Sequence, residues 1–253
     1  MTLDIQKASM LKRFSAYLLD IIIVAILAVG FGLGLSAVTG YDSYNETFFQ
    51  VGEKYEAEYG VNFEMTQEQW EAMTQEEIDR YNEAYGALLQ DEEAMFAYNM
   101  IVNLTLMIAS LGILLAYLVW EFAIPLWLGN GQTAGKKIFG IALMRVDGVK
   151  VTPLMMFVRT ILGKYTIGTM IPVLLFIMML YGSIGIVGPL IIIGLAALQL
   201  GLMLFSQNHT AIHDYLSQCV AVDMSSQMIF DTPEQMQAYQ QKLQDRQEDQ
   251  ENA

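Results

Sequence analysis

Three polar side chains lie at similar positions in separate apolar segments of the sequence. Asp20 stands directly before residues 21–38, a run without a charged residue. Glu121 and Gln199 each lie about six residues from the end of another apolar segment. Arg13 precedes Asp20 by nearly two helical turns, so both share one face of the helix. Asp20 then lies roughly 10 Å deeper in the membrane than Arg13. Because ionisable groups inside a membrane pair with one another, we expect a polar cluster of Asp20, Glu121 and Gln199 with Arg13 as its partner.

Two interpretations of this cluster remain open. Arg13 and Asp20 can fasten the first helix to its neighbours, because polar contacts between membrane helices contribute about 0.6–2 kcal/mol each. Alternatively, two carboxylates beside one arginine cannot easily both stay charged in a low dielectric, so one would hold a proton that a cation displaces. The second interpretation describes a minimal cation–proton exchange site.

The composition indicates a membrane protein. The chain is 54% hydrophobic and only 16% charged, whereas soluble domains carry about 25% charged residues. A bilayer core of roughly 30 Å is crossed by about 20 apolar residues in a helix. The sequence offers four such segments, near residues 14–38, 98–127, 166–181 and 186–205. Because the stretch YGSIGIVGP contains helix breakers, the last two segments are predicted to form a tight helical hairpin.

The distribution of charge predicts the orientation. Basic residues gather at the N-terminus and after the second segment: Lys7, Lys12, Arg13, Lys136, Lys137, Arg145, Lys150, Arg159 and Lys164. Residues 40–97 hold two basic against fifteen acidic residues, a net charge of −13 out of −14 for the chain. Short cytoplasmic loops collect Lys and Arg. Both termini are therefore predicted to be cytoplasmic and residues 40–97 to be external, in a protein of the plasma membrane.

Two segments outside the apolar runs carry helix-start signals. Thr74 and Glu77 have the spacing of a capping box, and apolar residues follow at helical intervals, which predicts an external helix that runs toward or into the second span. Thr232 and Pro233 have the types that favour the cap and the first position of a helix in the C-terminal segment. Both helices are expected to be mainly solvated.

The basic loop after the second span contains the motif LGNGQTAGKK, with Gly131, Gln132, Thr133, Gly135 and Lys136. A phosphate-binding loop is excluded by its spacing, because only three residues separate the two glycines and a second lysine follows the first. Further on, an extended stretch leads to the dipeptide Asp-Gly, which predicts a small cytoplasmic β-hairpin.

Three motifs of this sequence resemble the RDD family of bacterial membrane proteins. They are RFSAYLLD, GQTAGKKIFGIALMRVDG and AIHDYL, in the same order around the predicted spans. The resemblance extends from about residue 8 to 223, apart from the acidic insertion. It implies an integral membrane protein for which transport has been suggested, without a mechanism. The naming residues of the family correspond to Arg13, Asp20 and Asp214.

The chain departs from the family just before its His-Asp pair. Related proteins usually carry basic residues there, whereas this chain has Gln207, Asn208 and His209. The departure argues against a salt-bridge or lipid-headgroup role at this place.

Two functional hypotheses follow. The first is a small cation or proton-coupled transporter, expected to be a homo-oligomer because four helices enclose little room. The second is a non-transporting membrane module that docks or stabilises an unknown membrane partner. No hydrolase or dinucleotide motif occurs in the sequence, so we expect no enzyme activity, cofactor, metal or nucleic-acid partner. The lipid bilayer is an expected partner of the four apolar helices.

The predicted fold is an all-α polytopic membrane protein. It has four transmembrane helices with both termini cytoplasmic, a helical acidic extracellular insertion and a small cytoplasmic β-hairpin. The predicted segments are residues 1–39 (N-terminus and first helix), 40–97 (insertion), 98–128 (second helix), 129–165 (basic loop), 166–206 (third and fourth helices) and 207–253 (tail).

Overall fold

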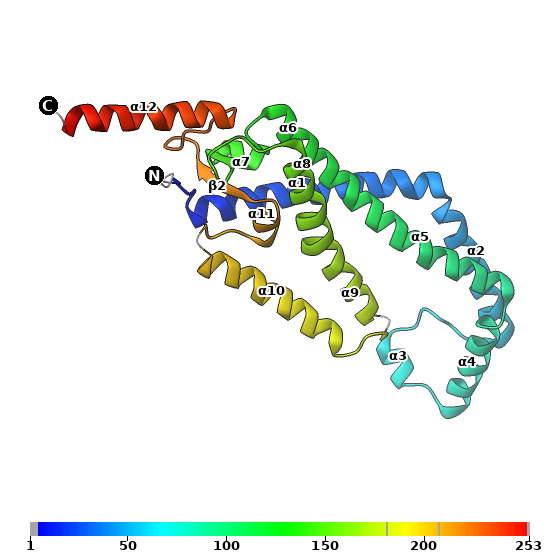
Figure 1. Ribbon diagram of the computed structural model, residues 1–253. Coiled ribbons are helices and arrows are strands. Elements are labelled where there is room, and N and C mark those ends of the chain that lie inside the picture. Colours follow the sequence, from blue (N-terminus) through cyan, green and yellow to red (C-terminus); the bar gives the residue numbers. More distant parts are fainter. Residues whose placement is uncertain (1–4, 181, 207, 252–253) are drawn as a thin grey trace. The chain divides into compact units, whose positions relative to one another are not determined.

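The computed structural model describes residues 5–180, 182–206 and 208–251 (Figure 1). Tyr181 and Gln207 of the sequence analysis lie outside these ranges. The chain divides into two compact units, Met1–Ala28 with Ile113–Ala253 and Val29–Gly112.

Four helices of the described chain are long and apolar enough to cross a membrane, as predicted. The first is α1 (Met10–Thr39) and the fourth is α10 (Val187–Phe205). The second and third each contain a π-helical segment, a rare geometry that is frequent at functional sites. The second consists of α5 (Glu92–Tyr117), η1 (Leu118–Ala123) and α6 (Ile124–Leu128), and the third of α8 (Pro153–Phe157), η2 (Val158–Met170) and α9 (Ile171–Leu180).

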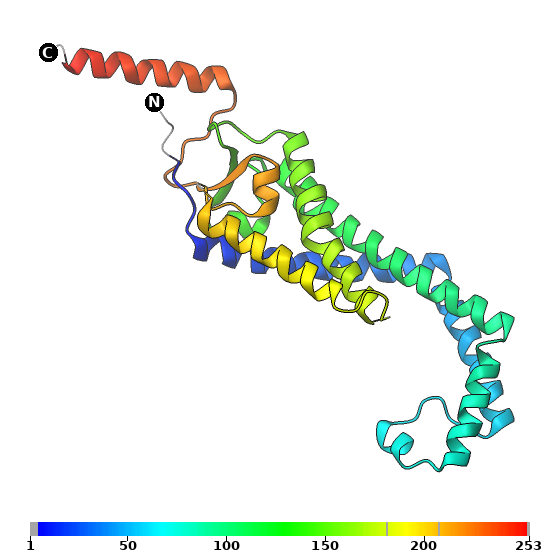
Figure 2. The same ribbon diagram turned by 60° about the horizontal axis from the view of Figure 1, so that its bottom comes forward.

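The third span begins earlier than the sequence predicted. The sequence predicts residues 129–165 as the basic loop, but residues 153–165 are helical from Pro153 onward. Thr152 caps this helix by accepting a hydrogen bond from the Met155 N–H at 3.3 Å. The third helix ends at Leu180 and the fourth begins at Val187, so the predicted break between them is confirmed. Figures 1 and 2 show α9 and α10 as neighbours.

A two-stranded antiparallel sheet joins distant parts of the chain. Strand β1 (Ile141–Arg145) pairs with β2 (Cys219–Asp223), with Leu143 opposite Ala221. The predicted hairpin is therefore corrected. The Asp-Gly turn forms and the Arg145 N–H donates to the Val149 carbonyl at 2.8 Å. The segment beyond the turn contributes only isolated bridges, of Lys150 to Met144 and of Val149 to Phe230. The main partner of β1 is a strand that the sequence analysis placed in the cytoplasmic tail.

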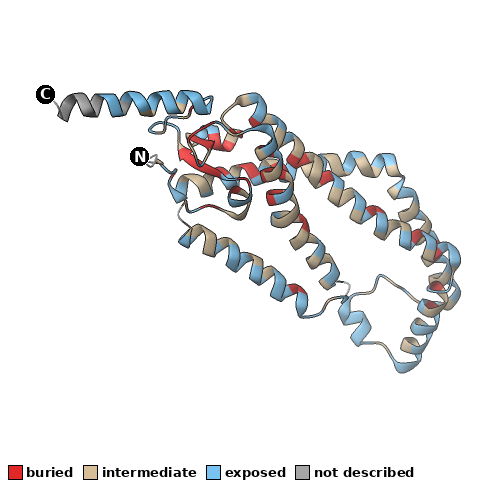
Figure 3. Cartoon of the chain, viewed as in Figure 1, coloured by how far each residue is buried: buried red, intermediate tan, exposed pale blue. Residues whose placement is uncertain are grey.

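The core of the first unit lies around this sheet. Buried residues gather at β1, β2 and the adjoining helix ends, as Figure 3 shows. One cluster combines Ala8, Ala16, Ile141, Leu143, Met156 and Ala221. In contrast, α9 and α10 expose large apolar side chains such as Phe176, Ile193 and Phe205. Exposed apolar surface along spanning helices is what a lipid environment requires.

The short elements of the first unit surround the sheet. Helix α7 (Ala134–Ile138) follows the glycine motif and precedes β1, and α11 (Ile212–Leu216) precedes β2. Helix α12 (Pro233–Glu251) closes the chain and begins at the predicted Pro233, with Thr232 accepting from the Gln235 N–H at 3.3 Å.

The second unit contains the acidic insertion, with α2 (Tyr41–Tyr59), α3 (Gln67–Glu71) and α4 (Gln75–Leu88). The helical character and the Thr74–Glu77 capping box of α4 are confirmed. However, α4 does not continue into the second span, because Asp91 accepts from the Ala94 N–H at 2.9 Å and starts a new helix. Helices α2 and α3 were not predicted.

Candidate functional site

Six buried ionisable side chains form one network in the first unit. Three are acids and three are bases, so their formal charges cancel. All six residues are between 2% and 8% exposed: Asp20, Glu121, Lys136, Arg159, Lys164 and Asp214. They come from α1, η1, α7, η2 and α11. A buried charge is tolerated when it is paired, and each of these six groups lies beside a group of opposite charge.

Asp20 is held by donors from two other segments. Its Oδ2 accepts from the Thr133 hydroxyl at 2.5 Å, and its Oδ1 accepts from Trp120 Nε1 at 3.1 Å and the Gly135 N–H at 3.2 Å. The Lys136 ammonium lies 3.5 Å from Oδ2. Asp20 therefore fastens the glycine motif and η1 to α1, which is the structural role weighed for it.

Glu121 is the most heavily compensated acid. The Lys164 ammonium donates to its Oε1, and the Lys136 ammonium donates to its Oε2 at 3.4 Å. Nη1 of Arg159 lies 3.7 Å from the same Oε2. The neighbouring Thr160 hydroxyl donates to the Glu121 backbone carbonyl at 2.9 Å, which ties η2 to η1. Three cations thus surround one carboxylate.

Lys136 bridges the two carboxylates without a close contact to either. Its ammonium is 3.1 Å from the Thr133 hydroxyl, 3.4 Å from Glu121 Oε2 and 3.5 Å from Asp20 Oδ2. Charge-assisted hydrogen bonds are usually about 2.7–2.9 Å long. The ammonium therefore sits in a cage of three oxygens and is held less tightly than Lys164.

Arg159 extends the network to α11. Its Nε donates to Asp214 Oδ1 at 2.7 Å. Burial opposes ionisation of Asp214, but the charge of Arg159 outweighs it and holds the pKa of this carboxyl at about 2. Burial lowers the pKa of the adjacent His213 to about 3, so the imidazole is neutral near pH 7. The buried Nη1 of Arg159 has no hydrogen-bond partner among the described residues.

Two glycines allow the segments to approach one another. A Cβ added at Gly135 would meet the Ala16 carbonyl oxygen at 2.6 Å and Asp20 Oδ1 at 2.7 Å. A Cβ at Gly163 would overlap His213 on α11. A larger residue at either place would separate the charged groups.

The structure brings together only part of the predicted cluster. Asp20 and Glu121 share Lys136, as the expected juxtaposition requires. Gln199 instead accepts from the Ile212 N–H at 3.0 Å and so supports α11. The prediction that Arg13 pairs with Asp20 is corrected. Its Nη1 and Nη2 donate to the backbone carbonyls of His209 and Ala221 at 2.8 and 2.9 Å.

The glycine motif contributes to the network through several atoms. Thr133 caps α7, Gly135 donates to Asp20, and Lys136 enters the oxygen cage. Gln132 donates to the Ile141 carbonyl at 2.8 Å, and Gly131 adopts a positive φ of 62°. The motif is therefore a folded part of the charged core and not only a basic loop.

Sequence reasoning missed the cations that neutralise the acids. The sequence predicts Lys136, Arg159 and Lys164 as charges of the basic loop. A detectable signal was the five-residue spacing of Arg159 and Lys164, which matches the i→i+5 repeat of a π-helix. With three bases present, the acids need not share a proton. That argument for cation–proton exchange no longer applies.

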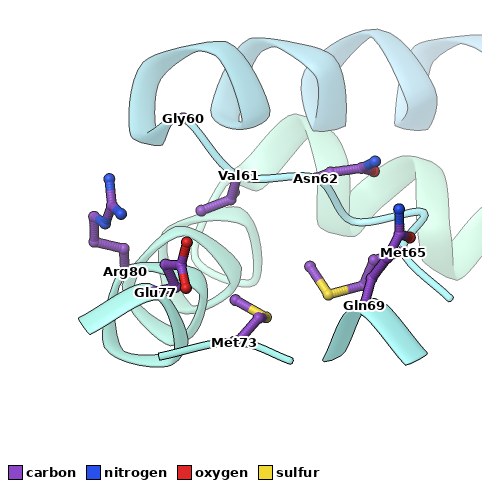
Figure 4. A pocket seen from close by; sticks show the side chains of 8 residues that line it. All are labelled: Gly60, Val61, Asn62, Met65, Gln69, Met73, Glu77 and Arg80. Carbon is purple, nitrogen blue, oxygen red and sulfur yellow. The ribbon is translucent and has the colours of Figure 1, made fainter. Parts of the chain in front are cut away.

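The network places one oxygen each of Thr133, Glu121 and Asp20 around a single ammonium group. No group of three or more His, Cys, Asp or Glu residues in the described chain could hold a metal ion. A separate cavity of about 220 Å³ lies in the second unit, between the loop that follows α2 and helix α4 (Figure 4). Its lining residues are Gly60, Val61, Asn62, Met65, Gln69, Met73, Glu77 and Arg80, and none belongs to the network.

Comparison with known proteins supports the resemblance in the motifs. The model of the RDD family matches residues 7–218, which is most of the chain. A search of curated proteins and a search of solved structures found no match. The match includes all six residues of the network and the three motifs around them. The chain belongs to the RDD family.

Proposed function

We propose that this RDD-family membrane protein exchanges a monovalent cation for a proton at the oxygen cage around Lys136. The observation that carries the proposal is the position of the Lys136 ammonium, 3.1–3.5 Å from Thr133, Glu121 and Asp20. The same three oxygens can ligate a small cation. Ionisable residues within membrane spans commonly mark such pathways.

Charge balance determines how the exchange would proceed. One N–H bond of the Lys136 ammonium breaks, the proton passes to water, and a neutral amine remains. A monovalent cation then takes the place of the ammonium between Glu121 and Asp20, so the net charge of the network does not change. Arg159 and Lys164 remain beside Glu121 and partly neutralise its charge.

Asp20 and Glu121 have different roles in this proposal. Asp20 receives three hydrogen bonds besides its contact with Lys136, so it positions the glycine motif. Glu121 contacts the side chains of two lysines and one arginine. When Lys136 is replaced by a cation, Glu121 therefore keeps its contacts with the other two bases. This assignment replaces the hypothesis in which one of the two carboxylates holds the exchanged proton.

Lys136 and its neighbour Lys137 provide a matched test. Lys136 is buried in the cage, whereas Lys137 is exposed. In proteoliposomes containing only this protein, a sodium, potassium or lithium gradient should drive proton flux in the wild type and in Lys137→Gln. Lys136→Gln should reduce the flux to the background of empty liposomes. Absence of wild-type flux with all three cations, in both orientations, would overturn the proposal.

The orientation is part of the same proposal. Both termini are placed in the cytoplasm and residues 40–97 outside, on the asymmetry of Lys and Arg. Cysteines introduced at Glu68 and Lys150, in a chain whose buried Cys219 is replaced by Ala, should react with an impermeant reagent from opposite sides. Reaction from the same side would contradict this topology.

Docking of a partner is the second candidate, and the acidic unit favours it. Its carboxylates on α4 are mostly exposed. The basic cytoplasmic turn is a weaker docking surface, because Arg145 pairs with Asp147 and Lys150 pairs with Asp231, each at 2.5 Å. A silent flux assay together with specific retention of a cationic membrane partner by the acidic unit would favour docking over transport.

A further inference from the structure

A hydrogen-bonded chain of uncharged oxygens begins one turn before Glu121. Tyr117 precedes Glu121 by four residues and is 7% exposed. Its hydroxyl lies 2.9 Å from the Thr169 hydroxyl, which in turn donates to the Lys164 backbone carbonyl at 3.0 Å. This series of hydrogen bonds therefore ends at Lys164, whose ammonium binds Glu121. Because Thr169 uses its proton on the carbonyl, Tyr117 must be the donor to Thr169.

The series of hydrogen bonds depends on the π-helical geometry of η2. Thr169 reaches the carbonyl five residues earlier, and Thr166 does the same to Ile161 at 2.8 Å. Thr169 also contacts Tyr117 of the other helix, whereas the described hydrogen bond of Thr166 stays within η2. The two threonines therefore differ in one respect, the contact across the helix pair.

We propose that the hydroxyls of Tyr117 and Thr169, with the Lys164 carbonyl, form a second and uncharged station for the transported cation. This inference rests on the proposed function and names where the cation lies before or after the oxygen cage. Backbone carbonyls in distorted spanning helices coordinate sodium in transporters, and carbonyl oxygens replace the hydration shell of alkali cations in channels. Tyrosine and threonine hydroxyls add oxygen ligands without a charge that would hold the cation too tightly.

A purely structural role for Tyr117 and Thr169 makes a different prediction. A hydrogen bond between membrane helices contributes little to stability, so its loss would slightly weaken folding without changing cation dependence. The station predicts the reverse, a change in cation dependence with folding nearly intact. Measurements of flux and thermal unfolding on the same variants separate the two roles.

The test compares Thr169→Val, Thr169→Ser and Thr166→Val in proteoliposomes. Valine keeps the shape of threonine and removes the hydroxyl, so Thr169→Val should raise the sodium concentration for half-maximal flux about tenfold, equivalent to about 1.4 kcal/mol. Thr169→Ser retains a hydroxyl and should stay close to the wild type. Thr166→Val loses only the bond within its helix and should also stay close. Tyr117→Phe should share the defect of Thr169→Val.

Failure of the station can be distinguished from failure of the proposed function. If Thr169→Val has the same flux and the same sodium dependence as the wild type, the station is overturned and the proposed exchange stands. An equal defect in Thr169→Ser and Thr169→Val, or in Thr166→Val, would also overturn the station, because the shared hydroxyl would not be the cause. Absence of flux in the wild type would overturn both.

Discussion

The acids of this protein occupy two different environments. In the first unit, Asp20, Glu121 and Asp214 are buried and contact basic side chains. In the second unit, which holds the acidic insertion, most carboxylates are exposed. Glu56, Glu77 and Asp91 accept hydrogen bonds from nearby backbone N–H groups. Glu77 accepts from the Thr74 N–H at 2.7 Å, and hydrogen bonds from Thr74 lower the pKa of its carboxyl.

This difference shows that the number of acids does not identify a functional site. Residues 40–97 contain fifteen acidic residues, yet water can solvate them and they need no compensating base. The buried network has only three acids, but each of them must be compensated in a low dielectric. We therefore expect changes in the network to alter folding and transport, and changes in the insertion to alter mainly local structure.

The largest expected effect follows from removing the central acid. Glu121→Gln leaves the charges of Lys136, Arg159 and Lys164 without their shared carboxylate, and breaking a buried pair costs about 3–5 kcal/mol in the free energy of unfolding. The thermal midpoint in detergent should fall strongly. Glu83→Gln, which changes an exposed acid of α4, should leave the midpoint unchanged.

A second variant sharpens this prediction. The closest partner of Glu121 is Lys164, so Glu121→Gln combined with Lys164→Met restores the charge balance. The double variant should be more stable than the sum of the two single losses, with a coupling of about 1–3 kcal/mol. Additive losses would mean that the two side chains do not act as a pair.

The Asp214–Arg159 pair predicts a pH dependence. The pKa of Asp214 is lowered from its ordinary value to about 2, so the stability it contributes is complete above about pH 4 and is lost as the pH falls toward 2. The contribution is on the order of 2 kcal/mol. Unfolding in detergent between pH 5 and pH 2 should show a decline that is smaller in Asp214→Asn. The same decline in both proteins would contradict this assignment.

A smaller effect is expected from glycine substitutions. Gly135→Ala places a Cβ 2.6 Å from the Ala16 carbonyl oxygen, so overpacking should cost about 1–3 kcal/mol. Gly86→Ala lies in α4, where an added Cβ meets no atom within 4 Å. Alanine favours a helix over glycine by up to about 1 kcal/mol, so this variant should be neutral or slightly stabilised. Equal thermal midpoints for the two variants would remove the distinction between the regions.

The spans and the helix starts could be predicted from the sequence because their signals are local. Apolar length revealed four helices, and Thr74 and Thr232 marked two helix starts. The pairing of β1 with β2 could not be predicted, because it joins residues such as Leu143 and Ala221 that are far apart in the chain.

Only part of the candidate site could be predicted for the same reason. Depth along the helices correctly placed Asp20 near Glu121, but depth does not determine which face of a helix meets which neighbour. Gln199 therefore turned out to support α11. Arg159 and Lys164 were misassigned because their charge indicates a cytoplasmic loop unless buried acids are known to face them.

The central claim is that a cation replaces the proton of Lys136 between Asp20 and Glu121. It is tested most directly by adding sodium, potassium or lithium to the purified protein in weakly buffered detergent and measuring proton release with a pH dye. We expect about one proton per chain in the wild type and in Lys137→Gln, and none in Lys136→Gln, because binding and deprotonation are linked. Proton release that persists in Lys136→Gln, or no release from the wild type with any of the three cations, would contradict the account.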